Sequence, residues 1–212
     1  MPRRLSRESI VTTAIALADR DGLTGLSMRR LAQELGVDPM SIYYHVRDKE
    51  TLLGEMLDAV VSSISPPAAT GPWTDRLRSL IMQARGTMLL HPWAARVLEA
   101  RADPTPAVLL HIERVLSVMR SGGCPVDLGH HAIHLLGSRI LGFSQDLFDD
   151  SGDTSVPPAV AQEWASTMPH VAELAGAVSH TGVLGGCDDD AEFAFALDLL
   201  LDGLERRRSA QP

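Results

Sequence analysis

Apolar residues recur every three or four positions along most of the chain, which is the spacing of one face of an α-helix. Alternating runs rich in Val, Ile, Thr and aromatic residues, which would indicate β-strands, are missing. The pattern therefore predicts an all-α protein. A first helix is expected over about residues 7–21, with Asp21-Gly22 at its end. Its apolar stripe consists of Ile10, Val11, Ala14, Leu17 and Ala18.

Two short helices are expected next, because suitable capping residues mark their ends. Ser27 is a good N-cap, and the helix that follows it ends at Gly36, a residue that can take the left-handed conformation of a turn. Asp38 then caps a helix that begins at Pro39, since proline lacks the N–H donor that the first helical position leaves unbonded. We expect this helix to reach about Val46.

A longer helix follows Asp48, and its wide apolar face runs from Leu52 to Ile64. The proline-rich and glycine-containing segment 65–72 breaks it and predicts a boundary. Beyond that boundary, the same spacing predicts helices near 73–90, 92–101, 104–121, 126–148, 158–179 and 189–208, with a possible kink at Pro169.

The composition limits the function classes. The chain has 212 residues, of which 45% are hydrophobic and 22% charged, enough apolar material for a buried core. It contains no apolar run of the roughly 18 residues that a membrane span needs, and its start lacks the apolar core of a signal peptide. We therefore expect a soluble, cytoplasmic protein with no membrane partner. Its two cysteines have no CxxC spacing, which excludes a disulfide scaffold and a cysteine-based zinc site.

The net charge of -8 is unevenly distributed along the chain. Residues 1–50 carry 8 basic and 7 acidic side chains, a net charge of +1, whereas residues 51–212 carry 11 and 20, a net charge of -9. Because DNA repels an acidic surface, a nucleic-acid site is expected only in the first quarter of the chain.

Residues 27–46 have the pattern of a helix-turn-helix: two short helices with a glycine-centred turn between them. Leu31, Leu35 and Ile42 are spaced to share a core, which leaves Met40 and the run Ser41 to His45 largely facing outward. Tyr43 and Tyr44 on such a short helix are costly surface unless something binds there. The alternative is a plain helical hairpin whose tyrosines pack on the first helix.

The stretches LSMRRLAQELGV and SIYYHVRDKETLL resemble the N-terminal signature of the TetR/AcrR family, and most closely its tetracycline-repressor branch. The match covers about residues 8–56. The resemblance implies a three-helix DNA-binding domain at 1–48, a connecting helix at 49–64, and a helical effector-binding and dimerisation domain at 65–212.

The resemblance also implies roles in DNA binding. Ser41, Tyr43, His45 and Lys49 would hold phosphates, while Arg29 and the Pro39-Met40 pair would face base edges. Arg29 can pair bidentately with guanine, which is worth about 1–3 kcal/mol of base discrimination. Lys49 stands at a helix N-terminus, where a cation opposes the helix dipole unless a phosphate is bound. Tyr44 is equally well explained as a packing residue. The predicted DNA-binding set is Ser27, Arg29, Pro39, Met40, Ser41, Tyr43, Tyr44, His45 and Lys49.

One such unit reads only a few base pairs, so a palindromic operator requires two units, about 34–36 Å apart. The last helix is too apolar to face water, and with the helix at 126–148 it offers a surface for a second copy. The resemblance implies a four-helix dimer bundle; the alternative is that both helices close a monomeric core. The predicted interface residues are Phe193, Leu197, Leu200, Leu201 and Leu204.

The resemblance further implies an effector pocket among the middle helices, where polar and aromatic residues interrupt the apolar pattern. Taken alone, each such residue is more often an ordinary interior or surface residue, and only convergence of several in space would indicate a pocket. The candidate pocket residues are His91, Arg96, His111, His134 and Arg139.

His130, His131 and His134 form an HHxxH cluster, in which His130 and His134 lie one helical turn apart, the spacing of two metal ligands on one helix. No third ligand group or nearby glutamate completes such a site, so a solvated or dimer-face cluster is the favoured reading. We expect neither a metal nor a cofactor.

Motifs of hydrolases, nucleotide-binding enzymes and metalloproteases (GxSxG, GxGxxG, GxxxxGK, HExxH) are absent. The sequence thus predicts a ligand-responsive dimeric repressor rather than an enzyme, released from its operator when a small molecule tilts the connecting helix. The alternative is a helical small-molecule-binding protein or enzyme that uses the hairpin for protein contact.

Overall fold

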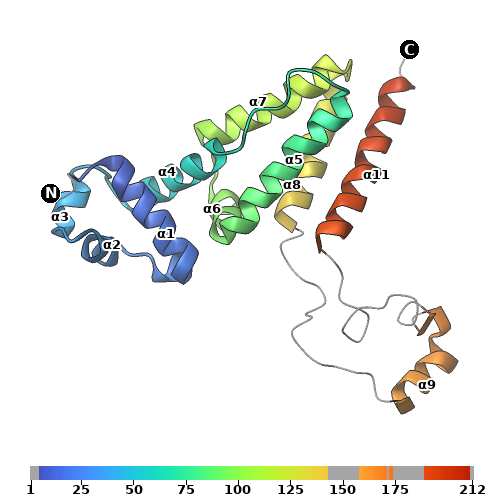
Figure 1. Cartoon of the computed structure of the whole chain (residues 1–212), viewed down its shortest axis with the longest axis horizontal. Helices are drawn as coiled ribbons and strands as arrows, with labels where there is room; N and C mark the ends of the chain where they lie inside the picture. Colours follow the sequence, from blue (N-terminus) through green and yellow to red (C-terminus); the bar gives the residue numbers. More distant parts are fainter. Residues whose placement is uncertain (1–4, 143–157, 171, 174–188, 211–212) are drawn as a thin grey trace. The chain divides into compact units, whose positions relative to one another are not determined.

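The structure is a computed structural model that describes residues 5–142, 158–170, 172–173 and 189–210, without the side chains of 138–142, 158–161 and 189. Within these ranges it contains ten helices and no strand, which confirms the all-α prediction (Figure 1). None of these helices is long and apolar enough to cross a membrane. The chain divides into two compact units, residues 1–141 with 201–212, and residues 142–200.

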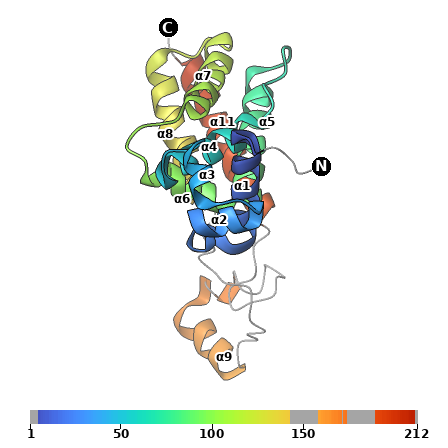
Figure 2. The same ribbon diagram turned by 90° about the vertical axis from the view of Figure 1, so that its left-hand side faces the viewer.

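The first three helices form a small bundle, called the head below. They are α1 (Arg7–Gly25), α2 (Met28–Leu35) and α3 (Pro39–Tyr43). Ser6 and Ser9 form a reciprocal capping box at the start of α1. Gly22 has a φ of 67°, so the regular part of α1 is interrupted at the predicted place and one further turn follows. Figure 2 views the molecule from the side on which the head lies.

The two capping predictions around the turn are confirmed. The Ser27 hydroxyl accepts a hydrogen bond from the backbone N–H of Arg30, and Asp38 accepts one from Met40. Gly36 takes the left-handed conformation, with φ 67° and ψ 32°, and ends α2.

Helix α3 is shorter than predicted, because it ends at Tyr43 rather than near Val46. Two turn hydrogen bonds to the Ile42 carbonyl continue past its end, from His45 and Val46. This turn buries Val46, which is 1% exposed, and lets Asp48 take the extended conformation that caps the next helix.

Helix α4 (Lys49–Ser62) connects the head to the following helices and packs against α1, α5, α6 and α7 (Figure 1). Its apolar face is fully buried at Leu52, Met56 and Leu57. Two polar contacts fix it on α7: Asp58 accepts a hydrogen bond from the Ala107 N–H at 2.9 Å, and Arg114 donates one to the Ile64 carbonyl at 2.9 Å.

The remaining helices lie close to their predicted ranges. Helix α9 ends before Pro169, as proline disfavours a helix at the residue before it. Residues 143–148 and 174–179, which the sequence assigns to helices, lie outside the described residues. The helices are α5 (Trp73–Leu90), α6 (Pro92–Ala100), α7 (Pro106–Ser121), α8 (Val126–Gly142), α9 (Pro158–Thr167) and α11 (Asp189–Ser209).

A tryptophan fixes the start of α5 against two other segments. The Trp73 indole N–H donates a hydrogen bond to Glu205 of α11 at 2.9 Å. The same side chain packs on Gly122, where an added Cβ would lie 2.3 Å from Cγ of Trp73. Only glycine therefore fits at position 122 while the indole keeps its bond.

Gly122→Ala is expected to destabilise the fold by about 1–3 kcal/mol, because the bonded indole has to move. Gly86→Ala is the matched control: Gly86 lies within α5 and an added Cβ meets nothing within 4 Å. Its gain in helix propensity should stabilise the protein by up to about 1 kcal/mol. Urea unfolding of both variants measures the difference, and equal effects would contradict the packing described.

Candidate nucleic-acid interface and ligand cavity

The outer surface of α3 presents bulky apolar and aromatic side chains. Met40 is 73% exposed and Tyr44 88% exposed, whereas Ile42 between them is fully buried. Tyr43 is also exposed, and the Tyr44 ring packs edge-on against His45 at 5.3 Å between centroids. Ser41, His45 and Pro39 are half-buried. The face of α3 opposite the core therefore carries the residue types predicted for DNA contact, with Tyr44 pointing to solvent rather than packing on α1.

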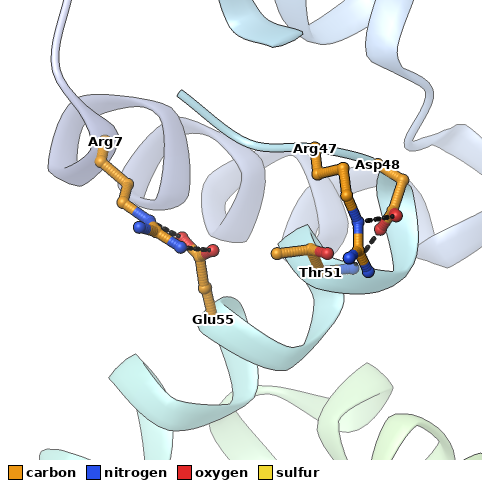
Figure 3. Close-up of polar contacts among 5 residues, drawn as sticks. All are labelled: Arg7, Arg47, Asp48, Thr51 and Glu55. Carbon is orange, nitrogen blue, oxygen red and sulfur yellow. Dashed lines mark hydrogen bonds and ion pairs between the residues drawn. The ribbon is translucent and has the colours of Figure 1, made fainter. Parts of the chain in front are cut away.

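The head contains five described arginines, and ion pairs divide them into two groups. Arg29, on the exposed side of α2, has no ion pair within the described part of the chain. The other four each form an ion pair with a carboxylate: Arg7 with Glu55, Arg20 with Asp21, Arg30 with Asp21, and Arg47 with Asp48. Figure 3 shows the first and the last of these pairs.

These pairs neutralise most of the positive charge of the head. The Arg7 guanidinium binds Glu55 of α4 with both Nε and Nη2, which raises the pKa of Arg7. Asp48 accepts the backbone N–H of Thr51, and this bond together with those to the Thr51 and Arg47 side chains lowers its pKa to about 2. Among the described arginines of this region, Arg29 is therefore the one whose charge has no carboxylate partner.

Lys49 has a structural role that the sequence did not reveal. Its ammonium donates a hydrogen bond to the Leu26 carbonyl at 2.6 Å and reaches the Leu23 carbonyl at 3.4 Å. It therefore satisfies carbonyls at the C-terminal end of α1, where the helix dipole favours a cation. The unfavourable position at the start of α4 is compensated within the protein, without a phosphate.

Polar contacts between α1 and the start of α6 also join the head to the following helices. One carboxylate oxygen of Asp19 accepts the indole N–H of Trp93 at 2.6 Å and lies 2.8 Å from Nδ1 of His91. His91, which the sequence placed in the effector pocket, is instead part of this contact.

A cavity of about 330 Å³ lies among α4, α5, α6, α7 and α8. Of the five predicted pocket residues, His111 lines it. Arg96 is exposed on α6, and His134 is exposed on α8 with its ring 4.7 Å from that of His130. The side chain of Arg139 lies outside the described residues. His91, Arg96 and His134 are not among the described residues that line this cavity.

Arg101, at the C-terminal end of α6, is the lining residue that sequence reasoning missed. Among the described lining residues it is the only charged one, and apart from His111 the others are apolar. Burial lowers the pKa of His111, and the nearby charge of Arg114 lowers it further. A basic residue just after a helix, beside the Ala102–Pro104 turn, was the available signal in the sequence.

The predicted dimer residues of α11 have low exposure in the single chain. Phe193, Leu197, Leu201 and Leu204 are at most 5% exposed in the single chain, and Leu200 is half-buried. The apolar residues that α11 leaves exposed are Phe195, at 63%, and Leu199, at 55%, one helical turn apart. The five predicted interface residues stay a prediction.

No group of three or more potential metal ligands is found among the described residues. Within α8, His130, His131 and His134 contact one another only ring to ring.

Comparison with known families accounts for both parts of the chain. The family "Bacterial regulatory proteins, tetR family" matches residues 10–56, and "Tetracyclin repressor-like, C-terminal domain" matches residues 65–208. The chain belongs to the TetR family. It is thus a transcriptional regulator of the helix-turn-helix type and not a member of an enzyme family, as its sequence predicted.

Individual TetR-family relatives extend over nearly the whole chain. The HTH-type transcriptional repressor DrrR1 of Streptomyces coeruleorubidus is 29% identical, over 95% of this chain and 77% of its own length. The class D tetracycline repressor of Escherichia coli is 28% identical, over 98% and 92%. A solved structure of the TetR-family protein ActR of Streptomyces coelicolor, in complex with actinorhodin, has a similar fold, with a TM-score of 0.76. Its sequence is 26% identical, and the match covers 97% of this chain and 99% of ActR.

Proposed function

We propose that this TetR-family regulator is a ligand-responsive repressor that acts as a homodimer. It binds a palindromic duplex operator through residues 27–46 and leaves it when a small molecule occupies the cavity. The observation that carries this proposal is the exposed surface of the head: Met40, Tyr43 and Tyr44 are exposed at α3, and Arg29, which has no ion pair among the described residues, is exposed on α2. Tyrosine hydroxyls fix a protein on phosphates, and arginine reads guanine.

We assign one function to each predicted domain. Residues 1–48 bind DNA, residues 49–64 connect the two domains, and residues 65–212 bind the effector and the second copy. Helix α4 is suited to the connecting role, because its two ends contact different parts. Lys49 and Glu55 bind α1 near its start, while Val61 and Ile64 line the cavity near its end. A ligand that displaces the end of α4 therefore moves the head.

Dimerisation is supported by apolar surface that a single chain leaves uncovered. Helix α11 exposes Phe195 and Leu199, one helical turn apart. Large apolar side chains gathered on one face of a helix are typical of an interface. Two heads at a fixed separation then read the two halves of a palindrome.

Selection of duplexes from a randomised library by the purified protein tests the DNA-binding part. We expect an inverted repeat to be enriched, and binding of the enriched duplex to weaken at least about tenfold when the salt concentration rises from about 50 to about 200 mM. Failure to enrich any duplex would favour the alternative, in which the hairpin contacts a protein.

A variant with an added negative charge tests whether the exposed face of α3 binds DNA. Met40→Glu adds a carboxylate to the exposed face of α3, at a position near a helix N-terminus where an acidic residue does not disturb the fold. It should weaken duplex binding at least about tenfold, because it repels phosphates. Ser79→Glu adds the same charge to an exposed position of α5 and should leave binding within about twofold of the parent. Parent-like binding by Met40→Glu would contradict the proposal.

A further inference from the structure

The ligand cavity carries a positive charge without a matching negative one. Arg101 brings a guanidinium group to the cavity, and no carboxylate is among the described residues that line it. The two acidic residues nearest to it in the sequence, Glu99 and Asp103, are exposed and form no ion pair with it in the described part of the chain. A charge beside apolar walls is costly unless a counter-ion is present.

Two polar atoms of the lining also lack partners. Nε of Arg101 and Nδ1 of His111 are buried, and neither has a hydrogen-bonding partner among the described residues. Such buried, unsatisfied groups are rare in folded proteins and each calls for an explanation. Because both belong to side chains that line one cavity, an incoming acceptor group that bonds to these side chains provides one.

The rest of the lining defines the body of the ligand. Fourteen of the sixteen described lining residues are apolar, so a ligand that fills the space must be apolar over most of its surface. The volume of about 330 Å³ admits a drug-sized molecule of two or three fused rings. Among common acceptor groups, a carboxylate matches the planar fork of a guanidinium.

We propose that the cavity binds an apolar carboxylic acid, whose carboxylate pairs with Arg101 and bonds to His111 while its body fills the apolar space. The inference rests on the proposed function and adds the chemical class of the effector. The inference also gives Arg101 a role in the response to the effector, because the guanidinium of Arg101 lies against α4. A Cβ added at Gly54 of α4 would be 3.2 Å from Nη1 of Arg101. A bound anion thus acts directly on the connecting helix.

Calorimetric titration with anthracene-2-carboxylate and its neutral carboxamide tests the inference, since the two probes have the same shape. The parent protein should bind the carboxylate about 10- to 100-fold more tightly than the amide. Arg101→Gln should reduce this ratio to about one, whereas Arg101→Lys should keep a preference for the carboxylate. Arg96→Gln, which removes an exposed arginine of the same helix, should not change the ratio.

The outcomes separate the inference from the proposed function. An equal affinity for both probes, no binding of either, or a preference that survives in a folded Arg101→Gln protein would overturn the inference. Thermal melting verifies that each variant is folded. If Arg101→Gln does not fold, the test rests on Arg101→Lys. Operator binding by the parent is measured separately, so a regulator that binds DNA but does not select the carboxylate keeps its proposed function and loses its proposed ligand class.

Discussion

Replacing Arg29 with alanine should weaken binding to the selected operator duplex by about 10- to 100-fold for each half-site. Arg29 is exposed on α2, and within the described residues its charge is not neutralised by any carboxylate. Binding of this guanidinium to DNA costs little free energy, because no ion pair has to break first. The loss should depend on sequence: a bidentate contact to guanine discriminates between base pairs, whereas a phosphate contact does not.

Arg30→Ala is the matched control for this prediction. Arg30 is the adjacent residue on the same helix, but its guanidinium lies 2.8 Å from a carboxylate oxygen of Asp21. Its removal should change duplex binding by less than about threefold. Fluorescence anisotropy with the operator and with single-base variants measures both proteins. Equal losses for the two arginines, or a loss for Arg29→Ala that is the same on every sequence, would show that Arg29 does not read bases.

Introducing two carboxylates at Phe195 and Leu199 should convert the proposed dimer into a monomer, with the dissociation constant of the dimer raised at least about 100-fold. Both side chains are exposed on one face of α11, so Phe195→Asp with Leu199→Asp adds charge without disturbing the core of the single chain. In a dimer, the same charges would be buried without partners. Operator binding should fall with dimerisation, because separate heads lose their shared affinity.

The control for the dimer prediction is a pair of exposed leucines on another helix. Leu109 and Leu110 of α7 are each 52% exposed, and their replacement by aspartate adds the same charge to the surface. Sedimentation velocity should find this variant dimeric. A dimeric Phe195→Asp, Leu199→Asp protein, or a monomeric α7 variant, would place the interface elsewhere.

Local signals in the sequence were sufficient for the helix boundaries of the head. Ser27, Gly36 and Asp38 act through bonds within three residues of themselves, so their roles follow from residue type and spacing. The end of α3 was missed, because it depends on the burial of Val46 and on the extended conformation of Asp48, which the rest of the head determines.

Longer-range features could not be predicted in the same way. Periodicity identified the apolar stripe of α11 but not whether it faces its own chain or a second one, and Phe193 and Leu197 belong to the buried side. A similar limit applies to the cavity. Arg96 and Arg101 look alike in the sequence, and only the packing of α6 on α4 decides that Arg101 reaches the interior.

Lys49 is the only lysine in the chain, and it is bonded to the carbonyls at the end of α1. Amine-reactive reagents therefore have a single side-chain target, situated where the first helix meets the connecting helix. Acylation removes the ammonium charge and its hydrogen bonds together. The rate of this modification is accordingly a chemical measure of how often that junction opens, and a fluorophore attached there would follow the movement of the head when an effector arrives.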